Sequence, residues 1–162
     1  MKKEILFDMD GTIADLYGYP GWLEKIKCFD STPYLNAKPR YNNHSLLTAL
    51  VRDLKRCGYK IKIVSAFPYA DTTTEEFNAE IAKAKRKWLE DNHFPYDEVY
   101  FIPYEENKGN YSSPECDISI LVDDNQKVRK DFMHASKAKN AETIDATENI
   151  LIALANLIKE EI

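Results

Sequence analysis

Short apolar runs alternate along this chain with longer segments whose apolar residues recur at helical spacing. The short runs predict β-strands at residues 3–7, 60–64, 98–102, 118–122 and 142–144. The longer segments predict helices at residues 43–57, 74–92, 125–134 and 146–161. Strands that alternate with helices and read as apolar runs are typical of a parallel sheet covered on both faces. We therefore expect a three-layer α/β fold with a Rossmann-like parallel sheet.

The segment between the first predicted strand and the first long helix is irregular, because glycine and proline punctuate it. These residues are Gly18, Pro20, Gly21, Pro33 and Pro39. One helix is predicted here, opening at residues 20–21 and carrying Trp22, Leu23 and Ile26. We therefore expect a core domain of residues 1–15 and 43–162, with a small helical cap insertion at residues 16–42.

Composition and charge narrow the classes of protein that fit. The chain has 162 residues, of which 44% are hydrophobic and 30% charged, and its net charge is -5. This length fits one domain, or one domain with a small insertion. A mildly acidic chain without a basic block is a poor electrostatic partner for long nucleic acid, so we expect a small phosphorylated ligand instead.

The apolar runs and the cysteines point to an intracellular protein. The run at residues 5–7 is too short for a signal peptide, and that at residues 150–155 is far below the roughly 20 residues of a membrane span. The three cysteines are scattered and form no CxxC pair, so neither a zinc site nor a disulfide framework is indicated. We therefore expect a cytoplasmic protein with reduced thiols and no membrane partner.

Three of the predicted strands end in polar residues. Asp8 and Asp10 follow the first strand, Ser65 follows the second, and Asp123 and Asp124 follow the fourth. Because ligands of open parallel sheets bind beyond the carboxyl ends of the strands, these side chains should converge. Such a cluster of carboxylates stays ionised only beside a cation, and an all-oxygen site favours Mg2+. We therefore expect a magnesium site built from these aspartates.

A metal ion beside carboxylates indicates phosphoryl transfer. One carboxylate can attack phosphorus and form an aspartyl-phosphate, and a second one nearby can protonate the leaving oxygen and later activate water. The turn at Met9, Asp10 and Gly11 is expected to offer backbone N–H groups as an anion nest. The absence of a side chain at Gly11 would let the backbone approach a phosphate closely.

The sequences FDMDGT, VSA and LVDD, together with a lysine between the last two, resemble the haloacid dehalogenase-like (HAD) phosphohydrolase superfamily. The resemblance spans residues 8–124 and implies a HAD fold with a cap. It makes Asp8 the nucleophile and Asp10 the general acid and base. It also implies that Ser65, with the adjacent Ala66, binds the phosphate. Asp10 favours a phosphatase over a dehalogenase, because dehalogenases of this superfamily lack it.

The same resemblance implies how the metal is held. The Mg2+ ligands would be Asp8, the backbone carbonyl of Asp10, and Asp123. Asp124 would lie in the same coordination shell or just behind it.

The superfamily pattern also requires a lysine that neutralises the nucleophile and the phosphate. The helix at residues 74–92 has an apolar stripe made of Phe77, Ile81, Ala84, Trp88 and Leu89. Lys85 falls within this stripe, whereas Lys83 and Lys87 lie off it. Lys85 is therefore expected to point inward to a carboxylate, the alternative being a side chain that snorkels to solvent. Lys108, in the loop before the last motif, is a second candidate for binding phosphate.

A narrower resemblance concerns the 5'(3')-deoxyribonucleotidase family. The pattern DMDGxxAD at residues 8–15 and KRKW at residues 85–88 resemble its motifs, and Lys108 can match a lysine before its final strand. The implied activity is dephosphorylation of nucleoside monophosphates. Three features differ from that family: the insertion is small, Leu16 stands where an aromatic residue is usual, and the segment at residues 103–114 is long. Asp15 is expected to anchor the loop after the first strand.

Other functions remain open at this stage. A HAD phosphatase for sugar phosphates or another small metabolite is one, and a phospho-accepting regulatory domain resembling response-regulator receivers is another. A binder that keeps the metal without turnover is a third. The tyrosines of the insertion are candidates for stacking on a base, or for packing the insertion or a homodimer contact: Tyr17, Tyr19, Tyr34 and Tyr41.

Overall fold

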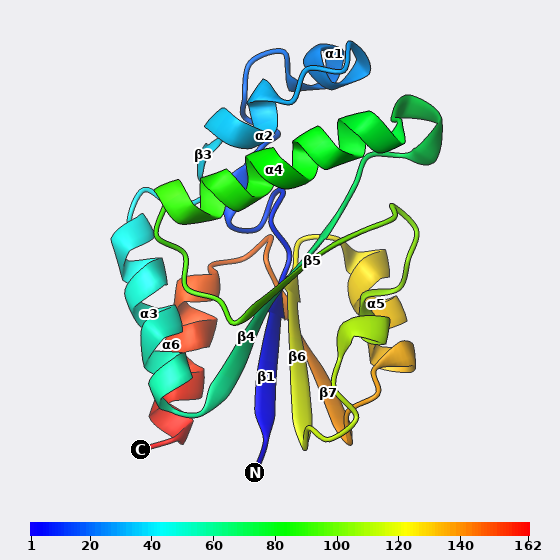
Figure 1. Ribbon diagram of the computed structural model, residues 1–162. Coiled ribbons are helices and arrows are strands. Elements are labelled where there is room, and N and C mark those ends of the chain that lie inside the picture. The colour runs from blue at the N-terminus through cyan, green and yellow to red at the C-terminus, as the bar shows by residue number, and fades with distance from the viewer.

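A computed structural model describes residues 1–162, and its centre is a parallel β-sheet (Figure 1). The strands are β1 (Lys3–Phe7), β4 (Tyr59–Ala66), β5 (Glu98–Ile102), β6 (Ile118–Asp123) and β7 (Asn140–Asp145). Their spatial order is β5-β4-β1-β6-β7, and every neighbouring pair is parallel. Counting only these five strands in chain order, the sheet reads 3-2-1-4-5, which places the first strand at the centre. The prediction of a Rossmann-like α/β fold is confirmed.

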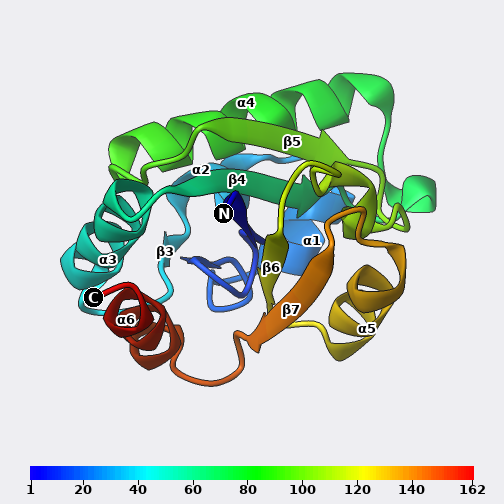
Figure 2. The same ribbon diagram turned by 90° about the horizontal axis from the view of Figure 1, so that it is seen from below.

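Helices cover both faces of the sheet (Figures 1 and 2). The helices α3 (His44–Arg56) and α6 (Ile150–Glu160) pack side by side on one face, where the larger apolar core lies. The other face is covered by α5 (Gln126–Ala135) and by the short 3-10 helix η2 (Lys108–Tyr111). No helix is long and apolar enough to cross a membrane.

The alternation of side chains along the central strand explains these two cores. Ile5 and Phe7 of β1 are buried in the larger core, whereas Leu6 belongs to a smaller cluster with Phe132 of α5. Successive residues of a strand point to opposite faces, so a strand buried on both sides needs apolar residues at consecutive positions. The run Ile5-Leu6-Phe7 meets this requirement, and all three side chains are buried.

The helix α4 (Glu75–Asp91) connects the sheet to the segment at residues 16–42 (Figure 1). Its second half contributes Trp88 and Leu89 to the larger core. Its first half packs on α1 (Trp22–Lys27) and α2 (Thr32–Asn36) through a separate apolar cluster. The insertion therefore shares its core with α4, and its description as a separate cap stays a prediction.

The insertion contains the helix predicted near Trp22 and two features that were not predicted. One is α2, and the other is β3 (Lys38–Pro39), which pairs antiparallel with β2 (Ala14–Asp15) just before the insertion. The side chain of Asp15 accepts a hydrogen bond from the backbone N–H of Gly18 at 3.1 Å, so it does anchor the loop.

The predicted start of the last helix needs correction. The last helix begins at Ile150 rather than at residue 146, because Asn149 caps it by accepting a hydrogen bond from Leu151 N–H at 3.0 Å. The preceding residues form a turn in which Asp145 accepts a hydrogen bond from Thr147 N–H. The long segment at residues 103–114 contains η2, and residues after β4 form a second 3-10 helix, η1 (Ala70–Thr72).

Replacement of Trp88 by Phe tests the link between the insertion and the core. The Trp88 indole is fully buried and donates a hydrogen bond to the Ala37 carbonyl at 2.7 Å. Trp88→Phe removes this donor and part of the ring, and should lower the free energy of unfolding by about 2–3 kcal/mol in urea titrations. Tyr100→Phe is the control, because the partly exposed hydroxyl that it removes can be replaced by water. An equal loss of unfolding free energy in the two variants would contradict this role of Trp88.

Candidate active site

The carboxyl ends of β1 and β6 bring three carboxylates together. Phe7 lies beside Val122 in the register of these strands, so Asp8 and Asp123, the next residues, are neighbours. The backbone N–H of Asp8 donates to the Val122 carbonyl at 3.0 Å, which extends the pairing to the edge. Side-chain oxygens of Asp8, Asp123 and Asp124 lie within 4.8 Å of one another. The structure thus brings these predicted residues together.

Lys108 lies between two of these carboxylates. Its ammonium is 2.8 Å from Asp8 Oδ1 and 2.7 Å from Asp123 Oδ2, and its side chain is 5% exposed. Burial alone would lower the pKa of Lys108, but the charges of Asp8 and Asp123 outweigh this effect and raise the pKa. Lys108 therefore stays protonated at neutral pH. Of the two candidate lysines, it is the one that contacts the predicted nucleophile.

Lys85 reaches the same site from α4 and binds different partners. Its ammonium donates to Asp10 Oδ2 at 2.9 Å, to Ser65 Oγ at 2.8 Å and to the Ala66 carbonyl at 3.0 Å. It also lies 5.0 Å from the centre of the Tyr34 ring. The side chain is 1% exposed, so the prediction that it points inward to a carboxylate is confirmed, and the snorkelling interpretation is wrong.

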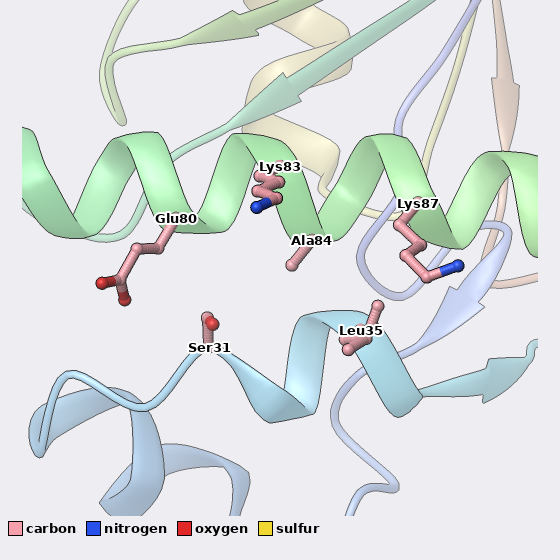
Figure 3. Close-up of a pocket in the computed structure, with 6 residues that line it drawn as sticks. All are labelled: Ser31, Leu35, Glu80, Lys83, Ala84 and Lys87. Carbon is pink, nitrogen blue, oxygen red and sulfur yellow. The ribbon is translucent and has the colours of Figure 1, made fainter.

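The neighbouring lysines of α4 lie elsewhere. A groove of about 200 Å3 between α2 and α4 is lined by Ser31, Leu35, Glu80, Lys83, Ala84 and Lys87 (Figure 3). None of the strand-end carboxylates lines this groove. The helical period therefore separates Lys85 from Lys83 and Lys87 as predicted.

The charges of the site leave room for a divalent cation. When all four are ionised, the carboxylates of Asp8, Asp10, Asp123 and Asp124 carry two more negative charges than the ammonium groups of Lys85 and Lys108 neutralise. Burial, and next the charge of Asp8, raise the pKa of Asp123 to about 6 and that of Asp124 to about 7. An all-oxygen donor set of this kind suits a hard cation. The cluster can therefore hold a metal, with Asp8, Asp123 and Asp124 as its side-chain ligands.

The side chain of Asp10 lies outside that cluster and is bound by Lys85 instead. Burial raises the pKa of Asp10, the charge of Lys85 opposes this effect, and the charge of Asp8 adds to it, so the net shift is upward. Asp8 and Asp10 thus have separate lysine partners and different surroundings. The expected metal contact of Asp10, through its backbone carbonyl, stays a prediction.

Sequence reasoning missed two residues that contact the aspartates of the site. The buried Thr12 hydroxyl lies 3.1 Å from Asp8 Oδ2 and 3.4 Å from Asp124 Oδ1. Arg129 of α5 donates to the backbone carbonyl of Asp123 at 2.9 Å. Thr12 stands inside the DGT motif, which is a signal for it. The sequence has no such signal for Arg129, because a helical pattern does not show which backbone carbonyl an arginine side chain reaches.

Gly11 has a role that differs from the predicted one. Its backbone N–H donates to the Ala14 carbonyl at 2.8 Å within the turn, so Gly11 does not contribute to the expected anion nest, and a nest from Met9 and Asp10 stays a prediction. Its φ is +79°, and a Cβ atom there would lie 2.5 Å from Asp124 Oδ2 and 2.7 Å from Tyr17 Cε2. Glycine is required here because a carboxylate and an aromatic ring pack against the backbone.

A cavity of about 860 Å3 opens above the carboxylates. Asp8, Asp10, Asp123, Asp124, Ala66 and Lys108 are among the residues that line it. Its aromatic lining consists of Tyr17, Trp22, Tyr34, Phe67, Tyr69 and Tyr104. Two of the four tyrosines considered for base stacking therefore reach the cavity, whereas the Tyr41 hydroxyl donates to the Glu148 carbonyl.

No protein-family model matches this sequence, and no curated protein matches it. Solved structures do resemble the fold. The HAD domain of the effector protein Lem4 from Legionella pneumophila superposes with a TM-score of 0.55 at 13% identity, over 99% of this chain and 95% of that one. D,D-heptose 1,7-bisphosphate phosphatase from Burkholderia thailandensis gives a TM-score of 0.55 at 12% identity, covering 97% and 99% of the two chains.

The D,D-heptose 1,7-bisphosphate phosphatase of B. bronchiseptica, complexed with magnesium and phosphate, also has a TM-score of 0.55. It is 10% identical and covers 98% of this chain and 99% of its own. Together these likenesses show that the chain has the fold of HAD proteins.

Gly11→Ala tests the arrangement of the carboxylates. The added methyl group should displace Asp124 and weaken binding of Mg2+ or Mn2+ by about tenfold or more in calorimetric titrations, since even the loss of a group that orients a metal ligand typically costs about 10- to 100-fold. Gly58→Ala is the matched control, because Gly58 also has a positive φ of +91° but nothing within 4 Å of its Cβ position. Both variants should lose about 1–2 kcal/mol of stability from backbone strain. Equal metal affinity in the two would refute this role of Gly11.

Proposed function

We propose that this protein is a Mg2+-dependent phosphomonoester hydrolase that acts through an aspartyl-phosphate on Asp8. One observation carries the proposal: Asp8 and Asp10 lie at the base of one cavity, and each is paired with a different buried lysine. This arrangement separates a charged nucleophile from a carboxyl group with a raised pKa. The fold, which it shares with phosphatases, supports the same reaction class.

The first step forms a bond between a carboxylate oxygen of Asp8 and phosphorus, while the bond from phosphorus to the leaving oxygen breaks. Lys108 and Thr12 hold the two oxygens of Asp8 and so orient the carboxylate for in-line attack. The protonated Lys108 also balances the charge that gathers on the phosphoryl oxygens. Mg2+, when bound by the carboxylate cluster, would supply Lewis-acid stabilisation of the same oxygens.

Asp10 is proposed to move the protons. In its protonated form it donates to the leaving oxygen, and the resulting carboxylate then takes a proton from the water that attacks the aspartyl-phosphate. That second attack breaks the bond between Asp8 and phosphorus and releases inorganic phosphate. Lys85 orients Asp10 through its hydrogen bond and also donates to Ser65 Oγ. Ser65 is fully buried and does not line the cavity, so its contact with the phosphate stays a prediction. The Ala66 carbonyl accepts a hydrogen bond from Lys85, and a direct contact of Ala66 with the phosphate stays a prediction.

The preferred substrate is proposed to be a nucleoside monophosphate. Two edge-to-face aromatic pairs line the cavity: Tyr17 with Trp22 at 5.0 Å, and Tyr69 with Tyr104 at 5.4 Å between ring centres. Aromatic side chains with exposed faces suit a planar leaving group such as a nucleobase.

The charges around the cavity favour a single phosphate group. Besides Lys108, only Lys27 and Lys127 contribute positive charge to the cavity lining, and Lys127 is 2.7 Å from the Asp131 carboxylate. Glu105 and Glu106 line the same region. No cationic cluster is present for a second phosphate, which argues against a bisphosphate substrate. The acidic residues suit the hydroxyl groups of a sugar, so a sugar monophosphate is the second candidate.

The topology argues against a receiver-type regulatory domain. Flavodoxin-like receivers order their strands 2-1-3-4-5. This sheet reads 3-2-1-4-5, and the predicted nucleophile follows its central, first strand.

Asp10→Asn should separate the two chemical steps. p-Nitrophenyl phosphate needs no protonation of its leaving group, so this variant should release one equivalent of p-nitrophenol rapidly and then turn over about 10²- to 10⁴-fold more slowly than wild type. Intact-mass spectrometry of the quenched protein should find one added phosphoryl group. Asp8→Asn, which has the same shape as wild type, should show neither the burst nor the added mass. A burst in Asp8→Asn would exclude Asp8 as the nucleophile.

Phosphate release from a substrate panel tests the proposed specificity. The panel contains ribo- and deoxyribonucleoside monophosphates, sugar monophosphates and sugar bisphosphates, each assayed with Mg2+ and with a chelator. We expect the highest kcat/KM for nucleoside monophosphates and no turnover after chelation. Metal-dependent activity that is higher on sugar phosphates would refute the nucleotidase assignment and retain the mechanism. Activity that survives complete chelation would refute the role of the metal.

A further inference from the structure

Three polar residues of adjacent strands lie on the sheet face that α5 and η2 cover. They are Glu4 of β1, Lys62 of β4 and Ser119 of β6, and each is at most 3% exposed. Buried charges are rare in a sheet because their desolvation is costly unless every polar atom is paired. An apolar pair of similar volume is often at least as stable as a buried ion pair, so the charges at Glu4 and Lys62 call for a specific explanation.

Glu4 and Lys62 both bind the end of η2 and the residues that follow it. The Glu4 carboxylate is 2.7 Å from the Lys62 ammonium, and it accepts hydrogen bonds from both the N–H and the hydroxyl of Ser113, at 2.7 and 2.9 Å. Lys62 donates to the Tyr111 carbonyl at 2.8 Å and to Ser113 Oγ at 2.7 Å. The remaining contact of Glu4 is a hydrogen bond from Ser119 Oγ at 2.9 Å.

These contacts keep Glu4 ionised in the interior. Burial alone would raise the pKa of Glu4, but hydrogen bonds from Lys62 and Ser113 outweigh burial and lower the pKa. The ion pair therefore attaches residues 111–113 to the sheet through the hydrogen bonds described above.

The attached segment is the one that carries Lys108, since η2 runs from Lys108 to Tyr111. Its start is attached to α5: the Asn107 side chain donates to the Asp131 carbonyl at 3.1 Å. A Cβ atom on Gly109 would lie 2.7 Å from the Ala135 carbonyl carbon, so the helices are in close contact. Lys108 is thus held between an attachment to α5 and the ion pair of the sheet.

We propose that Glu4 and Lys62, with Ser113 as the link, are positioning residues that set the place of Lys108 between Asp8 and Asp123. This inference rests on the proposed function, because the proposed reaction is the reason why the position of the Lys108 ammonium matters. It also assigns a role to the long segment at residues 103–114, which the family resemblance left without one. Glu4, Lys62 and Ser113 do not line the cavity, so their effect on the reaction passes through Lys108.

Ser113→Ala tests this proposal, because it removes the hydroxyl that joins Glu4 and Lys62 and keeps the ion pair. It should lower kcat/KM for the best substrate by about tenfold or more, since displacement of a catalytic group by about 1 Å can cost up to 10²-fold. Ser119→Ala is the matched control: it also removes one buried hydroxyl bound to Glu4, but it does not touch the segment of Lys108. Its kcat/KM should stay within about threefold of wild type.

A double-mutant cycle with Lys108→Met separates positioning from a general structural role. If Ser113 acts through Lys108, Ser113→Ala should have almost no further effect on kcat/KM in the Lys108→Met background. The same loss in both backgrounds would overturn the proposal, and so would no loss in either background or an equal loss in Ser119→Ala.

Chemical labelling gives a readout that does not depend on turnover. The rate at which an amine-reactive reagent modifies Lys108, read by peptide mass spectrometry, should rise in Ser113→Ala and not in Ser119→Ala. Equal rates would overturn the proposal even if the wild type is an active phosphatase. A wild type without phosphatase activity would refute the proposed function, and the labelling rates would still decide whether the network holds Lys108. If Ser113→Ala does not fold, Glu4→Gln, which preserves the side-chain shape, takes its place in both measurements with the same expected results.

Discussion

The ammonium of Lys108 between two buried carboxylates is the interaction on which the site depends. Parallel pairing of β1 and β6 forces Asp8 and Asp123 together at the edge of the sheet. Their repulsion would destabilise the fold if no cation were present. Lys108 supplies one positive charge at 2.7 to 2.8 Å from each, and the unbalanced charge that is left suits a divalent ion. The same electrostatic need therefore accounts for the lysine and for the capacity of the cluster to hold a metal.

The rest of the molecule keeps the two lysines apart and in place. Lys85 comes from α4, whose first half packs on the insertion, and it binds Asp10. Lys108 comes from η2, which the pair of Glu4 and Lys62 attaches to the opposite face of the sheet from α3 and α6. Because each lysine is anchored in different elements, the two aspartates keep different partners although they are only two residues apart. That difference is what a nucleophile and a proton donor require.

The parts of this arrangement that could be predicted from sequence are those with a local signal. Polar residues directly after apolar strands identified Asp8 and Asp123, and the helical period identified Lys85 as buried. The position of Lys108 had no such signal, because a loop residue has no periodicity. Lys62 alternates with isoleucine as a half-exposed strand would, yet it is buried by a segment some 50 residues later in the chain. The start of α6 was misplaced because the turn before it competes with the helix for the same residues.

The stereochemical course at phosphorus tests the central claim most directly, because it reports how many displacements occur during turnover. A substrate whose phosphoryl group is made chiral with oxygen isotopes and sulfur would be hydrolysed in isotopically labelled water, and the configuration of the released thiophosphate determined. Attack by Asp8 followed by attack of water is a double in-line displacement, so the account predicts net retention of configuration. Net inversion would show direct attack of water on the substrate and would contradict the aspartyl-phosphate on Asp8.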